Sequence, residues 1–126
     1  MIEKFFDLPT FGLESDQKNK MLLDVLNRLT LHHSENCYDY KLIVKGLFNN
    51  SQEAHEIADL PYLPVNIFKT QQLKSIKHED IYKTMKSSGT SGNGNSQIIL
   101  DKFTSNLQAK ALRKTISSIF GENRSP

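Results

Sequence analysis

The sequence predicts an α/β fold, in which a helical hairpin is followed by a strand, a glycine-rich loop, a second strand and a final helix. Two long stretches in the first half and one near the end carry apolar residues at helical spacing. Two short runs containing β-branched residues lie on either side of residues 87–96, a decapeptide that holds three of the six glycines. These patterns favour long helices next to a small sheet.

The first predicted helix covers residues 15 to about 34. Its apolar side chains recur every three or four residues, and charged residues fall between them. The apolar positions are Leu22, Val25, Leu26 and Leu29. We expect Ser15 to be the N-cap, because a serine hydroxyl can accept a hydrogen bond from the free backbone N–H groups of the first turn.

The second predicted helix runs from about residue 35 to residue 48, and Asn49 and Asn50 are expected to end it. Its expected buried residues are Tyr40, Ile43, Val44 and Leu47. The two helices form the predicted hairpin and make up the helical front of the chain, residues 1–50.

The second half begins with two prolines in residues 60–65, which favour extended backbone over helix. A short element docking onto the core is expected next, with apolar residues Ile67, Phe68, Leu73 and Ile76. Residues 81–86 alternate in character and predict a strand, and the run QIIL at residues 97–100 predicts a second strand.

The last predicted helix covers about residues 104–120, with Asp101 or Thr104 as its cap and Gly121 at its end. Its expected buried face consists of Leu107, Ala111, Leu112, Ile116 and Ile119. Its expected solvated face consists of Lys110, Arg113 and Lys114.

The composition indicates one modest soluble domain over residues 1–126. Sixteen basic and 14 acidic side chains are interleaved, which argues against a nucleic-acid-binding surface. No apolar run is long enough to span a membrane, and the N-terminus lacks the apolar core of a secretory signal. Together with the single Cys37, these features predict a cytoplasmic protein.

Residues 87–96 (SSGTSGNGNS) are the strongest candidate for chemistry. Glycines allow several backbone N–H groups to converge on one anion, and serine and threonine hydroxyls add further donors. The other interpretation is a flexible connector, because the same residue types make ordinary linkers. A Walker A phosphate loop is excluded, because Asn95 stands where its lysine is required and the following segment predicts a strand instead of a helix.

Three ordered blocks resemble the acyl-protein synthetase family of the LuxE type, a branch of the AMP-forming, adenylate-forming ligases. The blocks are residues 60–69 (LPYLPVNIFK), 83–92 (KTMKSSGTSG) and 100–102 (LDK). The stretch HHSENC at residues 32–37 is similar as well, so the resemblance covers nearly the whole chain. It implies that the chain is the N-terminal portion of an adenylate-forming ligase domain.

The resemblance also implies a reaction. A fatty acid and ATP form an acyl-adenylate with the help of Mg²⁺, and the acyl group then passes to a protein thiol that supplies a fatty acid reductase for aldehyde production. Segment 60–126 would carry the phosphate-binding loop, residues 87–96. The ATP-binding residues implied are Ser87, Ser88, Gly89, Thr90, Ser91 and Gly92.

The sequence departs from the family pattern in two ways, and both bear on the activity expected of this chain. Loops of this superfamily commonly end with a basic residue, whereas Asn95, Ser96 and Gln97 stand here, and Lys86 and Lys102 are the flanking candidates for that charge. The adenine, lid and acyl-carrying cysteine motifs of the longer relatives are absent. We therefore expect the chain alone to be inactive, and Cys37 to be a buried apolar residue instead of the acyl acceptor.

Two other functions remain open from the sequence. One is a non-catalytic remnant that binds a nucleotide or a protein. The other is a fragment of a related ligase that activates another carboxylate for polysaccharide or lipid synthesis.

Overall fold

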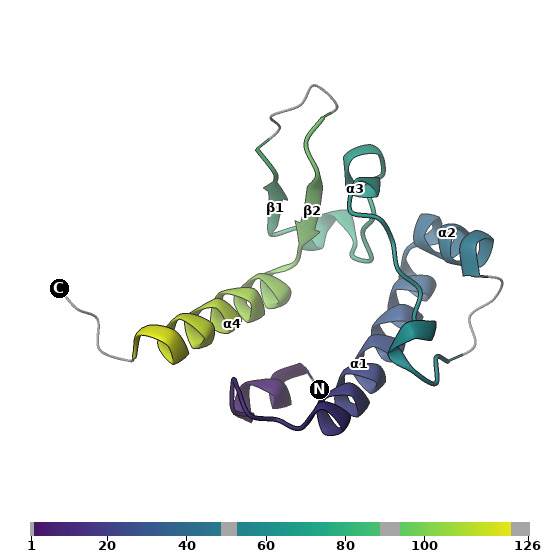
Figure 1. The fold of residues 1–126 in the computed structure, drawn as a ribbon. Helices are drawn as coiled ribbons and strands as arrows, with labels where there is room; N and C mark the ends of the chain where they lie inside the picture. The colour runs from purple at the N-terminus through teal and green to yellow at the C-terminus, as the bar shows by residue number, and fades with distance from the viewer. Residues whose placement is uncertain (1, 49–52, 89–93, 122–126) are drawn as a thin grey trace.

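The computed structural model describes residues 2–48, 53–88 and 94–121, and shows a helix-rich mixed fold with one small sheet (Figure 1). The α-helices are α1 (Ser15–Asn36), α2 (Tyr38–Phe48), α3 (Ile67–Thr70) and α4 (Lys102–Phe120). The strands are β1 (Lys83–Lys86) and β2 (Gln97–Leu100), and the 3-10 turns are η1 (Ile2–Asp7), η2 (Ile57–Asp59) and η3 (His78–Asp80). Within the described residues, no helix has the length and apolar character needed to cross a membrane.

The sheet is a two-stranded antiparallel hairpin, in which Lys83 pairs with Leu100 and Lys86 with Gln97. The α/β prediction is thus confirmed as a mixture of helices and strands. The second strand lies where the sequence predicts it. The first begins at Lys83 instead of Ile81, although the Tyr82 N–H still donates to the Leu100 carbonyl at 2.9 Å.

The two front helices form, but their junction differs from the prediction. Glu14 occupies the N-cap position of α1 and makes no side-chain cap hydrogen bond, so the assignment of Ser15 as the cap is wrong by one residue. At the other end α1 continues to Asn36, because its helical hydrogen bonds persist up to the Cys37 N–H, which donates to the His33 carbonyl. Extended backbone at Cys37 then separates α1 from α2.

The second helix buries less than the sequence predicts. Val44 is buried, with 2% exposure, and Tyr40 and Ile43 are half-buried. Leu47 is 64% exposed, so its predicted burial is wrong, because no described segment covers that side of α2. The predicted terminator, Asn49–Asn50, lies outside the described residues, and the last described residue of α2 is Phe48.

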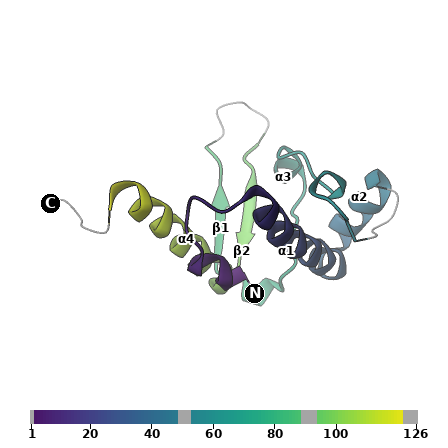
Figure 2. The same ribbon diagram turned by 60° about the horizontal axis from the view of Figure 1, so that its bottom comes forward.

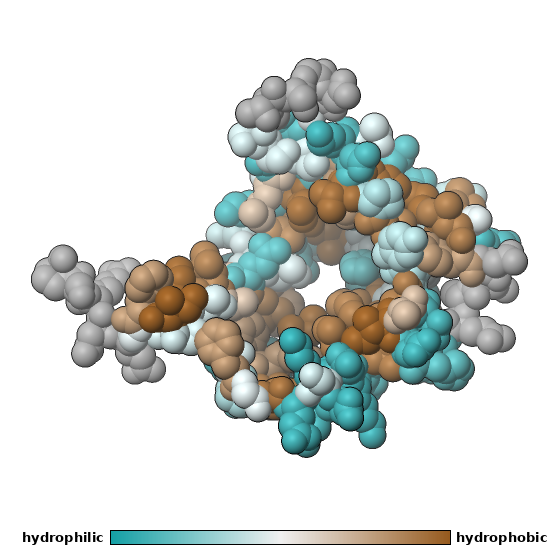
Figure 3. All heavy atoms as spheres, viewed as in Figure 1, coloured by the Kyte–Doolittle hydropathy of each residue, from teal (hydrophilic) through white to brown (hydrophobic). Residues whose placement is uncertain are grey.

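Small elements lie between the long helices α1 and α4 on two sides of the molecule (Figures 1 and 2). The hairpin and α3 lie side by side near the start of α4, and η1 lies between α4 and the start of α1. Apolar side chains gather around the central opening of this arrangement (Figure 3). The core is small, and its buried apolar residues in the described ranges are Cys37, Val44, Ala54 and Leu100.

The ends of α4 confirm the sequence prediction. The Asp101 carboxylate accepts a hydrogen bond from the Thr104 N–H at 2.6 Å, so Asp101 is the N-cap. Gly121 ends the helix with φ +80°, a conformation that favours glycine, and its N–H donates to the Ser117 carbonyl.

The face of α4 that is covered differs from the prediction. Leu112 and Ile119 are 61% and 62% exposed, Ile116 and Ala111 are exposed too, and only Leu107 of the predicted face is half-buried. Lys114, predicted to be solvated, is half-buried and donates to the Leu8 carbonyl at 2.6 Å and to the Phe6 carbonyl. The reason is that the N-terminal segment packs on the lysine side of α4, roughly opposite the stripe of Leu112, Ile116 and Ile119.

Candidate functional site

The glycine-rich loop is held at its base by the β-hairpin. Beyond the last strand pair, Lys86 and Gln97, the Ser87 N–H donates to the Ser96 carbonyl at 3.0 Å. The Ser96 N–H in turn donates to the Ser87 hydroxyl oxygen at 3.0 Å. These two bonds extend the ladder by one residue pair and close the neck of the loop, so residues 88–95 form the connection between the strands.

The described residues include two of the six predicted ATP-binding residues. Ser87 and Ser88 directly follow β1, and both are exposed. The Ser87 hydroxyl accepts a bond at the neck but keeps its own proton, so it can still donate to a ligand. The other four predicted residues, Gly89, Thr90, Ser91 and Gly92, lie outside the described residues.

Gly94 begins the return from the loop into β2 and brings the loop base close to α3. Its φ of +80° is in the region that favours glycine, and a Cβ at this position would lie 3.9 Å from the Lys69 carbonyl oxygen. The backbone of α3, far from the loop in sequence, thus lies next to the loop base. Sequence reasoning did not select Lys69 as a neighbour of the loop, although it ends the first of the three family-like blocks.

The flanking lysines occupy different ends of the hairpin. Lys86 is the last residue of β1 and borders the loop, whereas Lys102 begins α4 at the other end of β2. A four-residue strand spans roughly 13 Å, so of these two candidates only Lys86 is at the loop base. Residues 81–100 contain no aspartate or glutamate, so the hairpin itself carries only positive charge. This arrangement suits an anionic ligand.

Two side chains with shifted pKa values lie away from the loop. The hydrogen bonds from Thr104 lower the pKa of the Asp101 carboxyl at the start of α4. Burial, followed by the neighbouring His32, lowers the pKa of His33, whose Nδ1 lies 2.7 Å from the Ser75 hydroxyl oxygen. Neither group contacts the described part of the loop, and both hold structural elements together.

Cys37 occupies the junction between α1 and α2 and is only 7% exposed. A thiol at this position packs as a small apolar group, as the sequence analysis expects. The described residues contain no group of three or more His, Cys, Asp or Glu side chains arranged to hold a metal ion.

The described residues first define a class of structure: a β-hairpin whose closed neck carries exposed serines and Lys86 and leads into a glycine-rich connection, features that suit an anionic ligand. The family model of the acyl-protein synthetases, LuxE, matches residues 2–126. The chain therefore belongs to the LuxE acyl-protein synthetase family, and the resemblance seen in the sequence is confirmed at the level of the family. No curated protein and no solved structure matches the chain significantly.

Proposed function

We propose that this chain is the N-terminal part of an ATP-dependent acyl-protein synthetase of the adenylate-forming superfamily. The observation that carries the proposal is the family match over residues 2–126. The hairpin with its closed neck, its exposed serines and its lack of acidic residues supports a role in holding the triphosphate of ATP. In this proposal residues 1–126 form one domain portion that works together with further nucleotide- and acyl-binding residues.

The proposed reaction has two steps. A carboxylate oxygen of the fatty acid bonds to the α-phosphorus of ATP, the bond to the bridging oxygen breaks, and pyrophosphate leaves. A protein thiol then attacks the acyl carbon, which forms a thioester and releases AMP, and a fatty acid reductase accepts the activated acyl group. Mg²⁺ would neutralise charge on the phosphates.

The residues of the loop would act by electrostatic stabilisation. Backbone N–H groups near Gly89 and Gly92 and the hydroxyls of Ser88, Thr90 and Ser91 would donate to the β- and γ-phosphates. Lys86 at the loop base would supply the positive charge that the family pattern expects after the last glycine. These donors favour the leaving pyrophosphate and keep it in line with the attacking carboxylate.

Nucleotide binding by the purified chain tests this role. We expect ATP to bind weakly and Thr90→Ala to reduce the affinity about tenfold to hundredfold, as expected for the loss of one hydrogen bond to a charged group. The matched control is Thr84→Ala, because Thr84 is an exposed residue of β1 outside the loop. Absence of ATP binding, or an equal effect of both substitutions, would favour the connector interpretation and a non-catalytic role.

An exchange assay tests the expected inactivity of the chain alone. With ATP, Mg²⁺, labelled pyrophosphate and a long-chain fatty acid, we expect no exchange above background. Robust exchange would show that residues 1–126 already contain a complete adenylation site. Exchange with a different carboxylate, but not with fatty acid, would favour the alternative of a related ligase for polysaccharide or lipid synthesis.

A further inference from the structure

A second candidate site lies away from the loop, between the N-terminal segment and the two long helices. It is a cavity of about 610 Å³ bounded by residues 2–13, the first turns of α1 and the middle of α4. Figure 2 shows the N-terminal segment passing between these helices. The side chains that make its walls apolar include Phe5, Phe6, Leu13, Met21, Leu22 and Ala111. The volume is in the range of about 300–1,000 Å³ that ligand pockets occupy.

The charge on the cavity wall has one sign. Among the described residues that line it, the charged side chains are Lys18 and Lys114, and no carboxylate is present. Lys114 is held in place by its hydrogen bonds to the Leu8 and Phe6 carbonyls. An ammonium group has three donors, so one N–H of Lys114 remains for a ligand. Lys18 is exposed at the cavity wall and is free to turn toward an anion.

We propose that this cavity binds an amphipathic carboxylate, with the apolar body against the aromatic and aliphatic wall and the carboxylate at Lys18 and Lys114. An apolar wall favours an aliphatic or aromatic body through burial of surface, and two ammonium groups without a nearby wall carboxylate favour a single negative charge. A neutral or cationic amphiphile of the same length lacks the second interaction.

The site is separate from the proposed ATP loop. The α4 residues that line the cavity, Ala111, Lys114 and Thr115, begin ten residues after Asp101, which is about 15 Å along the helix. The loop lies at the opposite end of β2, roughly a further 13 Å away, and α4 leads away from the hairpin (Figure 1). A carboxylate bound at Lys114 is therefore not presented to ATP at the loop, so the cavity is a second, distinct site and the inference does not rest on the proposed function.

Titration calorimetry of the purified chain with decanoate, decanol and decyltrimethylammonium tests the ligand class. We expect saturable binding of decanoate that is stronger than binding of decanol, and no measurable binding of the cation. No saturable binding of decanoate, or equal binding of all three, overturns the proposal. ATP is absent from this experiment, so its result is independent of whether the loop binds nucleotide.

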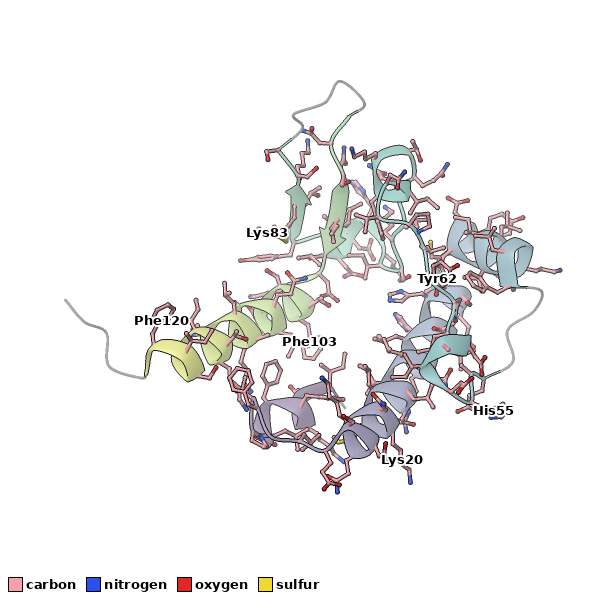
Figure 4. All side chains as sticks on the ribbon, viewed as in Figure 1. Lys20, His55, Tyr62, Lys83, Phe103 and Phe120 are labelled. Atoms are coloured by element: carbon pink, nitrogen blue, oxygen red, sulfur yellow. The ribbon has the colours of Figure 1, made fainter. Side chains whose placement is uncertain are left out.

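Matched substitutions test whether decanoate binds in this cavity. Ala111→Trp fills the cavity and is expected to weaken decanoate at least tenfold, whereas Ala109→Trp, at an exposed position of α4 outside the cavity lining, leaves binding unchanged. Lys18→Glu is expected to weaken decanoate about twofold to fivefold without affecting decanol. Lys20→Glu, on the same helix but outside the lining (Figure 4), should affect neither ligand. Circular dichroism verifies that each variant is folded, and equal effects within either pair contradict the assigned site.

Discussion

Asn27 and Ala54 exchange two hydrogen bonds across 27 residues of sequence. The Asn27 side-chain amide donates to the Ala54 carbonyl at 2.9 Å, and the Ala54 N–H donates to the Asn27 side-chain oxygen at 3.0 Å. Ala54 is buried, so its backbone groups depend on this one side chain instead of water. The pair fixes the segment after α2 against the middle of α1.

Replacing the Asn27 side chain is expected to destabilise the folded chain. Asn27→Ala leaves the Ala54 N–H and carbonyl without their partner, which should lower the free energy of unfolding by about 1–3 kcal/mol in urea denaturation. Asn19→Ala, at an exposed position of the same helix, should change it by less than about 0.5 kcal/mol. Equal stability of the two variants would show that solvent replaces the missing partner.

Lys114 is expected to anchor the N-terminal segment, because its ammonium donates to two carbonyls of that segment. Lys114→Met keeps most of the side-chain length but removes the donors, so amide hydrogens of residues 2–8 should exchange faster and stability should fall by about 1–2 kcal/mol. Hydrogen exchange followed by mass spectrometry measures the first effect. Arg113→Met on the exposed side is the control, and a similar acceleration in that variant would contradict the anchoring role.

The exposed stripe of α4 should tolerate polar substitution. Leu112→Gln and Ile116→Gln remove side chains that are 61% and 47% exposed, so each should change the unfolding free energy by less than about 0.5 kcal/mol. Val44→Ala is the contrast, because it removes two buried methyl groups and should cost about 2 kcal/mol. Urea midpoints in which Leu112→Gln is as damaging as Val44→Ala would show that the stripe is covered in solution.

The lowered pKa of His33 predicts a loss of stability on acidification. The unfolded chain takes up a proton near the ordinary value of 6.5, whereas the folded chain keeps His33 neutral to lower pH, because burial and His32 disfavour the charge. Unfolding free energy should therefore fall as the pH drops below about 6.5, and the fall should level off below the folded pKa. His33→Asn should flatten the plot of unfolding free energy against pH in this range. If the variant's plot instead runs parallel to that of the parent chain, His33 is excluded as the cause. The exposed His55→Asn variant serves as the control.

Much of the local structure follows from the sequence because it depends on neighbouring residues. The carboxylate of Asp101 three residues before Thr104 and the glycine at 121 suffice to begin and end α4. The two short runs around the glycine-rich segment predict the two strands for the same reason, and the structure adds that the strands pair antiparallel. Membership in the LuxE acyl-protein synthetase family follows as well, from the order of three short blocks.

The candidate site was predictable only in part. Ser87 and Ser88 stand in the sequence next to the glycines, and the structure adds that Ser87 closes the loop neck. The proximity of Lys69 to Gly94 depends on how α3 packs against β2, and no spacing in the sequence reports that contact. The structure also separates the two flanking lysine candidates, because Lys86 borders the loop whereas Lys102 follows the far end of β2.

By itself, the sequence determined the three long helices, the two strands, the caps of α4 and the family to which this chain belongs. The tertiary structure decided which side of α4 is covered. The N-terminal segment packs on the side with Lys114, and the apolar stripe of Leu112 and Ile116 stays exposed. The physical reason is the range of the interactions. The spacing of apolar residues reflects the amphipathicity of a few consecutive helical turns, whereas burial depends on which segment, distant in the sequence, packs against the helix. In this chain it is a contact between residues 106 positions apart, Leu8 and Lys114, that brings the N-terminal segment onto α4 and helps to form the cavity.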